Sequence, residues 1–167
     1  DVSIQGGPLP DSALVARRLL DSPWIICAAP AYLARHGTPV SIADLDRHDC
    51  IQFERPRTGQ SVPWLLRVDG RDVEVSTRGA LCITGDILGL ATAVRAGLGL
   101  TQMYRFTVEE DLKAGRLQEV MPLVGGASRP FNLLYPAHRH MPYAVRVLVE
   151  HLLRSEEHTS ELQSRSY

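Results

Sequence analysis

The sequence lacks the features that mark membrane proteins and nucleic-acid-binding proteins. It has no apolar run close to the roughly 20 residues that a membrane-spanning helix needs. Its net charge is −1 and its only lysine is Lys113, so it offers no basic surface for nucleic acid or an anionic membrane. We therefore expect no membrane partner and no direct contact of these 167 residues with DNA. The chain opens without a signal peptide, but also without a methionine, so its start says little about location.

Cysteine is scarce as well, with three residues, Cys27, Cys50 and Cys82, far apart and in apolar surroundings. No Cys-x-x-Cys pair indicates a metal or redox centre. We expect three buried, reduced thiols in a cytoplasmic protein. With 44% hydrophobic and 22% charged residues, the composition fits one globular unit or two small lobes.

Catalytic and cofactor motifs are missing too: the sequence holds no Gly-x-Ser-x-Gly, phosphate-binding loop or His-Glu-x-x-His. The run GLGLTQM lacks the third glycine of a dinucleotide motif and follows a helical pattern instead of opening one. His138 and His140 have no supporting carboxylate pattern, so a solvated loop is favoured over a metal site. His48, Asp49 and Cys50 are neighbours in sequence, which rarely form a catalytic set. We expect no catalytic residues, no metal and no cofactor.

What is present is an alternation of strand and helix patterns, with a hairpin signal at Asp69-Gly70. This order predicts an α/β fold with mixed sheets. A capping box, Thr107 with Glu110, predicts the start of one helix, and Pro142 predicts the start of the last. The expected strands lie at 1–4, 13–20, 24–30, 50–53, 64–83 (as several strands), 97–103 and 131–136, and the expected helices at 30–37, 41–44 (one short turn), 86–97, 107–115 and from 142 onward.

The closing residues 154–167 differ from the rest in composition. They are rich in Ser, Glu, His and Gln and have no apolar period. The run RSEEHTSELQS looks like the translation of a common sequencing adapter, so we expect a non-native tail. The alternative is a native disordered tail.

Several segments stand in a familiar order: DSALVARRL, CAAPAYLARHGTPVSIADLDRHDCIQF, AVRAGLGLTQ, EEDLKAGRLQEVMP and LLYPAHRHMPYAVRVLVEHL. Together they resemble the effector-binding domain of LysR-type transcriptional regulators over residues 1–153. The resemblance implies a two-lobe fold like that of type 2 periplasmic binding proteins, with crossovers near CIQF and PFNLLY. Lobe I would take 1–50 with 131–153, and lobe II would take 51–130.

The chain departs from the family pattern in two ways. The family's N-terminal winged helix-turn-helix, its linker helix and the first elements of lobe I are absent, so lobe I is expected to be incomplete and operator DNA to be bound only through the missing part. Gln5 stands where relatives usually have an arginine, and TQMYRF stands where a proline is common. The effector therefore cannot be inferred from relatives.

The turn before the helix at 86–97 gives one set of candidate effector-binding residues, Thr84, Gly85 and Asp86. Unpaired N–H groups at a helix N-terminus suit a carboxylate ligand. The alternative is plain capping of the helix. Phe53, on the expected crossover, is a candidate apolar wall, although core packing is the commoner use of a phenylalanine.

Strand ends give the other candidates, since ligands gather at the carboxyl ends of strands in open α/β folds. Gln5, Gly6 and Gly7 end one expected strand, where glycines allow close approach of the backbone to a ligand. The alternative is a turn that needs positive φ, and both can hold together. Thr101 and Gln102 end another, with a solvent-facing strand end as the alternative.

The resemblance implies the ligand-sensing and oligomerisation domain of a bacterial regulator. Its partners would be a small, possibly anionic effector and further copies of itself, as a homodimer or homotetramer. One alternative is a periplasmic solute-binding protein of the same fold. Another is an enzyme on that fold, which the missing catalytic set disfavours.

Overall fold

The structure is a computed structural model, which describes residues 2–6, 14–126, 128–136 and 143–152. Their contacts divide the chain into two compact units, 1–22 with 129–167, and 23–128. Residues 23–50 therefore cluster with 51–128, whereas we expected them in lobe I. No helix in the described part of the chain is long and apolar enough to cross a membrane.

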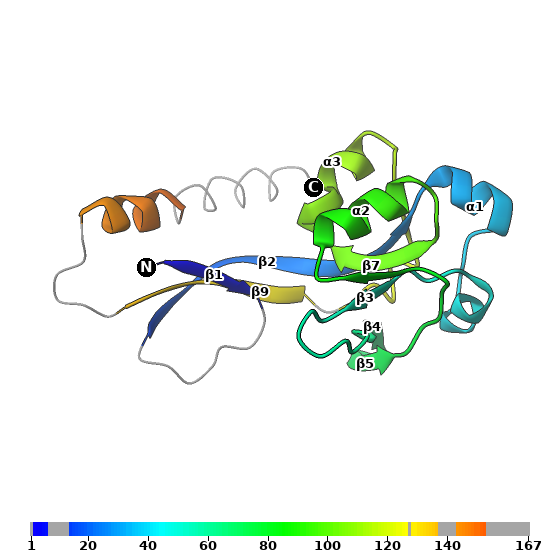
Figure 1. Cartoon of the computed structure of the whole chain (residues 1–167), viewed down its shortest axis with the longest axis horizontal. Helices are drawn as coiled ribbons and strands as arrows, with labels where there is room; N and C mark the ends of the chain where they lie inside the picture. The colour runs from blue at the N-terminus through cyan, green and yellow to red at the C-terminus, as the bar shows by residue number, and fades with distance from the viewer. Residues whose placement is uncertain (1, 7–13, 127, 137–142, 153–167) are drawn as a thin grey trace. The chain divides into compact units, whose positions relative to one another are not determined.

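The first unit combines strands from both ends of the chain (Figure 1). Strand β1 (Ser3–Gly6) pairs antiparallel with β9 (Ser128–Pro136), with Gln5 opposite Asn132. A helix covers 143–152, and its buried Val149 packs with Leu133 and Tyr135. Val145 and Leu152 of the predicted apolar stripe join this cluster, while Leu148 is 46% exposed. Pro142 and the tail 154–167 lie outside the described residues.

Strand β2 (Leu14–Ala28) is a single strand of 15 residues, where we expected two extended segments. Its last part carries the second unit's sheet, in which Trp24 to Ala28 pair antiparallel with β7 (Leu100–Tyr104). Strand β8 (Gln118–Val120), which the sequence did not predict, pairs with β2 on its other side. These pairings with 100–104 and 118–120 are the reason that residues from 23 onward belong to the second unit.

Helices α2 (Ile87–Arg95) and α3 (Arg105–Lys113) pack against β2 and β7 (Figure 1). Helix α3 starts two residues before Thr107, with Tyr104 as its N-cap, so the predicted Thr107–Glu110 capping box is wrong. The helix expected at 30–37 is α1 (Pro30–His36), and the turn at 41–44 is the 3₁₀ helix η1 (Ile42–Arg47), where Asp44 accepts the Ser41 N–H.

Two small sheets complete the second unit. Strands β3 (Gln52–Glu54) and β6 (Cys82–Thr84) pair in parallel, so their carboxyl ends lie side by side. Strands β4 (Trp64–Val68) and β5 (Arg71–Val75) form the predicted hairpin, turning at Asp69 and Gly70, both with positive φ.

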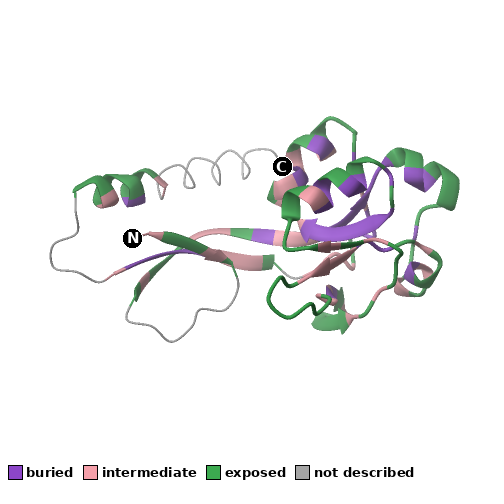
Figure 2. Cartoon of the chain, viewed as in Figure 1, coloured by how far each residue is buried: buried purple, intermediate pink, exposed green. Residues whose placement is uncertain are grey.

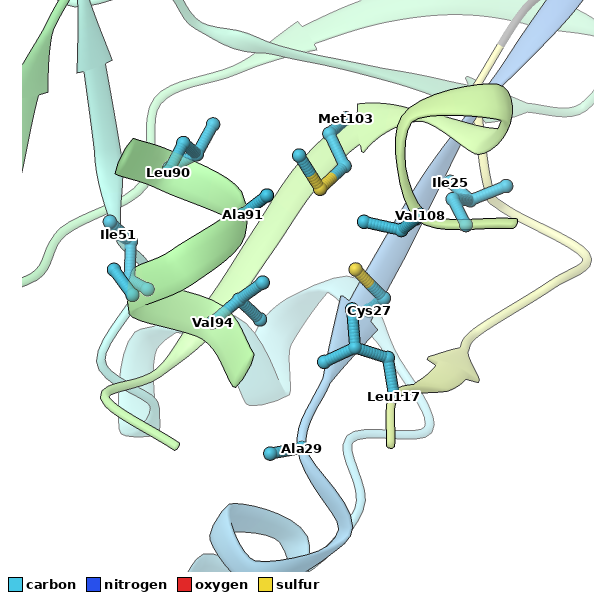
Figure 3. Close-up of a cluster of buried hydrophobic side chains, with 11 residues drawn as sticks. Ile25, Cys27, Ala29, Ile51, Leu90, Ala91, Val94, Met103, Val108 and Leu117 are labelled. Carbon is cyan, nitrogen blue, oxygen red and sulfur yellow. The ribbon is translucent and has the colours of Figure 1, made fainter. Parts of the chain in front are cut away.

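The core of the second unit lies on both faces of β2 and β7, and β7 is almost wholly buried (Figure 2). On one face, Ala91 and Val94 of α2 point toward Met103 of β7 and Cys27 of β2 (Figure 3). Such close-packed apolar contacts supply most of the stability of a domain this small.

Buried polar groups in this unit have specific partners. Asp111 of α3 is 4% exposed and accepts from the Nε atoms of Arg95 and Arg116, both at 2.6 Å. Burial raises the pKa of Asp111, but the two guanidinium groups outweigh burial and hold that pKa below its ordinary value. The buried Tyr32 hydroxyl accepts the Asp49 N–H at 3.0 Å and lies 3.1 Å from Nδ1 of His48.

Candidate functional site

The carboxyl ends of β3 and β6 bring Phe53 and Glu54 beside Ile83 and Thr84. The Thr84 hydroxyl donates to the Glu54 carboxylate at 3.2 Å, and the next N–H, of Gly85, donates to the Glu54 carbonyl at 3.0 Å. Gly85 has φ +68°, and a Cβ there would meet Pro56 at 2.4 Å. Only glycine fits this turn, which fixes the loop after β3 against the start of α2.

Asp86 is the N-cap of α2, and its carboxylate accepts the Gly89 N–H at 2.9 Å. The structure therefore shows the capping role that was one of the two alternatives for this turn. The carboxylate also places a negative charge at the helix end, where an anionic ligand would have to bind. This arrangement disfavours a second anion next to Asp86.

A hollow lies within the second unit, between β7, β3, the start of β4 and one side of α2. Its cavity volume is about 60 Å³, several times the roughly 10–15 Å³ that one water needs. It is lined by Trp24, Ile51, Phe53, Val62, Pro63, Trp64, Ile87, Leu90, Thr101, Gln102, Met103 and Tyr104. The structure thus brings three predicted site residues, Phe53, Thr101 and Gln102, to one hollow.

Thr101 and Gln102 lie inside β7 and are 1% and 4% exposed, so their prediction as a strand end was wrong. The Gln102 amide makes two hydrogen bonds with the backbone of Leu65, donating to its carbonyl at 2.7 Å and accepting from its N–H at 2.7 Å. These two hydrogen bonds resemble those between neighbouring strands of a sheet, and they attach β4 to β7. Gln102 therefore holds one wall of the hollow in place.

The other predicted residues are not part of this lining. Thr84, Gly85 and Asp86 are exposed and lie just before Ile87, which does line the hollow. In the first unit, Gln5 and Gly6 lie on β1, and a Cβ on Gly6 would meet the Phe131 ring at 2.9 Å, so its close approach serves packing. Gly7 lies outside the described residues, as do His138 and His140.

The aromatic residues Trp24, Trp64 and Tyr104 line the hollow but were not predicted from the sequence. Trp24 and Tyr104 face each other on β2 and β7, with ring centroids 4.3 Å apart. Only 6% of the residues are aromatic and only two are tryptophans, and both tryptophans line the hollow. Their scarcity was the available signal, but the strand pairing that gathers them is non-local.

The cysteines form no reactive centre with neighbouring groups. Cys27 and Cys50 are fully buried, and burial is the main cause that raises the pKa of each thiol to about 12. Cys82 on β6 is exposed, so the prediction that all three thiols are buried was wrong for this one. Among the described residues, no group of three or more His, Cys, Asp or Glu could hold a metal ion.

The mixed α/β fold, in two units through which β2 runs, is that of a periplasmic-binding-protein-like domain. The family model described as "LysR substrate binding domain" matches residues 1–156. The chain belongs to this family.

Similar curated proteins support the same family assignment. The chain is 32% identical over 158 residues to the HTH-type transcriptional regulator CrgA of Neisseria meningitidis, covering 92% of this chain and 50% of that protein. It is 30% identical over 153 residues to the HTH-type transcriptional activator AaeR of Escherichia coli, covering 91% and 48%. The chain thus spans about half the length of the curated relatives it matches.

Solved structures agree. The CrgA regulatory domain of Neisseria meningitidis superposes with a TM-score of 0.80 at 27% identity, covering 93% of this chain and 75% of that one. Full-length AphB of Vibrio cholerae gives 0.79 at 27% identity, covering 93% and 52%. These relatives are transcriptional regulators and not enzymes, which agrees with the expected lack of catalysis. Nothing among them supports the solute-binding alternative.

Proposed function

We propose that this chain is the effector-sensing part of a cytoplasmic LysR-type regulator. The match of the family model over residues 1–156 carries the proposal. The whole protein would bind operator DNA through an N-terminal winged helix-turn-helix and would act as a homodimer or homotetramer. A small molecule bound between the two lobes that the family resemblance implies would shift the balance between two arrangements of the protomers. The shift can be no larger than the difference in its affinity for the two.

Site residues from both lobes would contact this effector. On the lobe II side, the hollow beside Phe53 and Thr101 supports the proposal, since binding sites for small molecules are concave and mostly apolar with a few polar groups. The exposed turn Thr84–Asp86 directly precedes Ile87, which lines the hollow. From lobe I, the strand β1 with Gln5 and Gly6, followed by Gly7, would complete the site.

A thermal-shift screen of the chain against bacterial metabolites tests this function. A true effector should raise the melting temperature and bind at least tenfold more weakly to Phe53→Ala, because the apolar wall is lost. Thr84→Val keeps the size of the side chain and loses only the hydroxyl, and Asp86→Asn keeps an oxygen to cap α2. Both should weaken binding without unfolding the chain.

Leu123→Ala is the matched control, since Leu123 is 94% exposed and does not line the hollow. It should leave both binding and stability unchanged. An effector that binds with the same affinity to the Phe53, Thr84 and Asp86 variants would show that the site lies elsewhere. Sedimentation of the whole protein would test the dimer or tetramer, and a monomer at working concentration would contradict that part.

A further inference from the structure

The hollow in the second unit has a chemistry more specific than that of a general small-molecule site. Four of its lining residues are aromatic: Trp24, Phe53, Trp64 and Tyr104. Aromatic rings attract one another beyond the effect of the area they bury when they stack or meet edge to face. A planar ring in the hollow could make such contacts on more than one side.

Charge is missing from this lining. None of the described residues that line it is Arg, Lys, His, Asp or Glu, and its polar side chains, apart from the Trp and Tyr tips, are Thr101 and Gln102. The Gln102 amide is already bonded on both sides to Leu65. An ionised carboxylate would lose its hydration there and meet no cation, a penalty of several kcal/mol.

One donor in the wall of the hollow has no acceptor within the described part of the chain. The indole Nε1 of Trp24 is buried and has no hydrogen-bond partner among the described residues. An unpaired buried donor is unfavourable because it has lost its hydration, so an oxygen that reached it would recover part of this free energy. Unpaired buried polar atoms are few in folded proteins, and this one belongs to a side chain that lines the hollow.

From these observations we infer that the hollow takes an uncharged aromatic ring that carries a hydrogen-bond acceptor. This inference rests on the proposed function and narrows it, because it names the class of molecule that the lobe II side recognises. It also replaces the expected anionic effector with a neutral one at this hollow.

The two tryptophans make the test direct, since both line the hollow and the chain has no others. Three nitro compounds serve as quenching probes of tryptophan fluorescence, with correction for their absorption. Nitrobenzene has a neutral ring with acceptor oxygens, 4-nitrobenzoate adds a carboxylate to the same ring, and nitromethane has the nitro group without a ring. Nitrobenzene should quench saturably, 4-nitrobenzoate should bind at least tenfold more weakly, and nitromethane should quench without saturation.

A pair of matched variants locates the binding. Val62→Phe adds a ring to the lining and should weaken nitrobenzene binding at least fivefold, because it fills the space. Val73→Phe makes the same change on β5, at a side chain that is 40% exposed and outside the lining, and should leave binding unchanged. Circular dichroism checks that both variants fold. If Val62→Phe does not fold, the three probes measured on the unaltered chain remain the test.

Three results would overturn the inference. Nitrobenzene could quench without saturation, 4-nitrobenzoate could bind as tightly as nitrobenzene, or a folded Val62→Phe could bind nitrobenzene unchanged. None of them would refute effector sensing, which the metabolite screen tests separately. An effector from that screen which fails to compete with bound nitrobenzene would also overturn the inference while leaving the proposed function intact.

Discussion

Replacing Gln102 tests whether its side chain holds β4 against β7. In Gln102→Met the volume is nearly kept, but the N–H and carbonyl of Leu65 lose their partners, each at 2.7 Å. An unsatisfied buried donor or acceptor costs about 1–3 kcal/mol, and Leu65 is half-buried, so water can reach part of it. We expect a loss of about 2 kcal/mol, and about 3 kcal/mol in Gln102→Ala, which also leaves a cavity.

Urea unfolding followed by tryptophan fluorescence measures this change. The control is Gln118→Ala, an exposed glutamine on β8, which should change the free energy of unfolding by less than about 0.5 kcal/mol. At this chain length a loss of 2 kcal/mol lowers the melting temperature by roughly 4–8 °C. If Gln102→Met were as stable as the unaltered chain, the two hydrogen bonds would contribute nothing, and the reasoning would be refuted.

Three further predictions concern ionisable side chains. The pKa of Asp111 is held below 3.8, so its contribution is complete above about pH 4 and is lost as the pH falls through the folded pKa. Asp111→Asn should cost about 2 kcal/mol at pH 7 by urea unfolding, and this cost should shrink as the pH falls below about 4; a cost that does not change with pH would contradict this. Burial is the main cause that lowers the pKa of His48 from 6.5, and the charge of His36 is the second, so stability should fall as the pH drops below about 6.5. In thermal melts, His48→Gln should reduce this dependence of the melting temperature on pH. An unchanged dependence would contradict the prediction. A thiol reagent should label only Cys82 in the folded chain and three thiols in denaturant, and labelling of more than one thiol in the folded chain would show that the buried cysteines open readily.

The parts of the fold that local signals encode were predicted from the sequence. The hairpin turn at Asp69-Gly70 needs positive φ at both residues, which Asp-Gly allows, and Gly97 ends α2 in the same way. Helix α1 began at Pro30 as predicted, because proline fits the first helical position.

The parts that depend on distant partners were not predicted. Residues 13–20 and 24–30 were expected to form two extended segments, yet β2 runs through both, with β7 and β8 paired along its last residues. The start of α3 was misplaced because Tyr104, whose half-buried ring contacts Trp24, takes the N-cap that Thr107 was expected to supply. Local propensity is a weak prior where tertiary contacts decide.

The candidate site divides in the same way. Thr84–Asp86 could be proposed from the sequence because a helix start is a local pattern, whereas the hollow is assembled from five segments that lie far apart in the sequence. Trp24 comes from β2, Phe53 from β3, Trp64 from β4, and Thr101 with Gln102 from β7, and α2 closes the side. Only the pairing of the strands shows which aromatic residues line the hollow together.

This construction bears on how a ligand in the hollow could act. It would touch β3, β4, β7 and α2 at once, so its binding free energy would depend on how these elements are placed relative to one another. Moving a two-state regulator from 1:99 to 99:1 requires about 5.5 kcal/mol of differential binding. One ring contact supplies about 0.5–1.5 kcal/mol beyond burial, so several walls must differ between the two states. The attachment of β4 through Gln102 is one contact that a shift of these walls would have to keep or break.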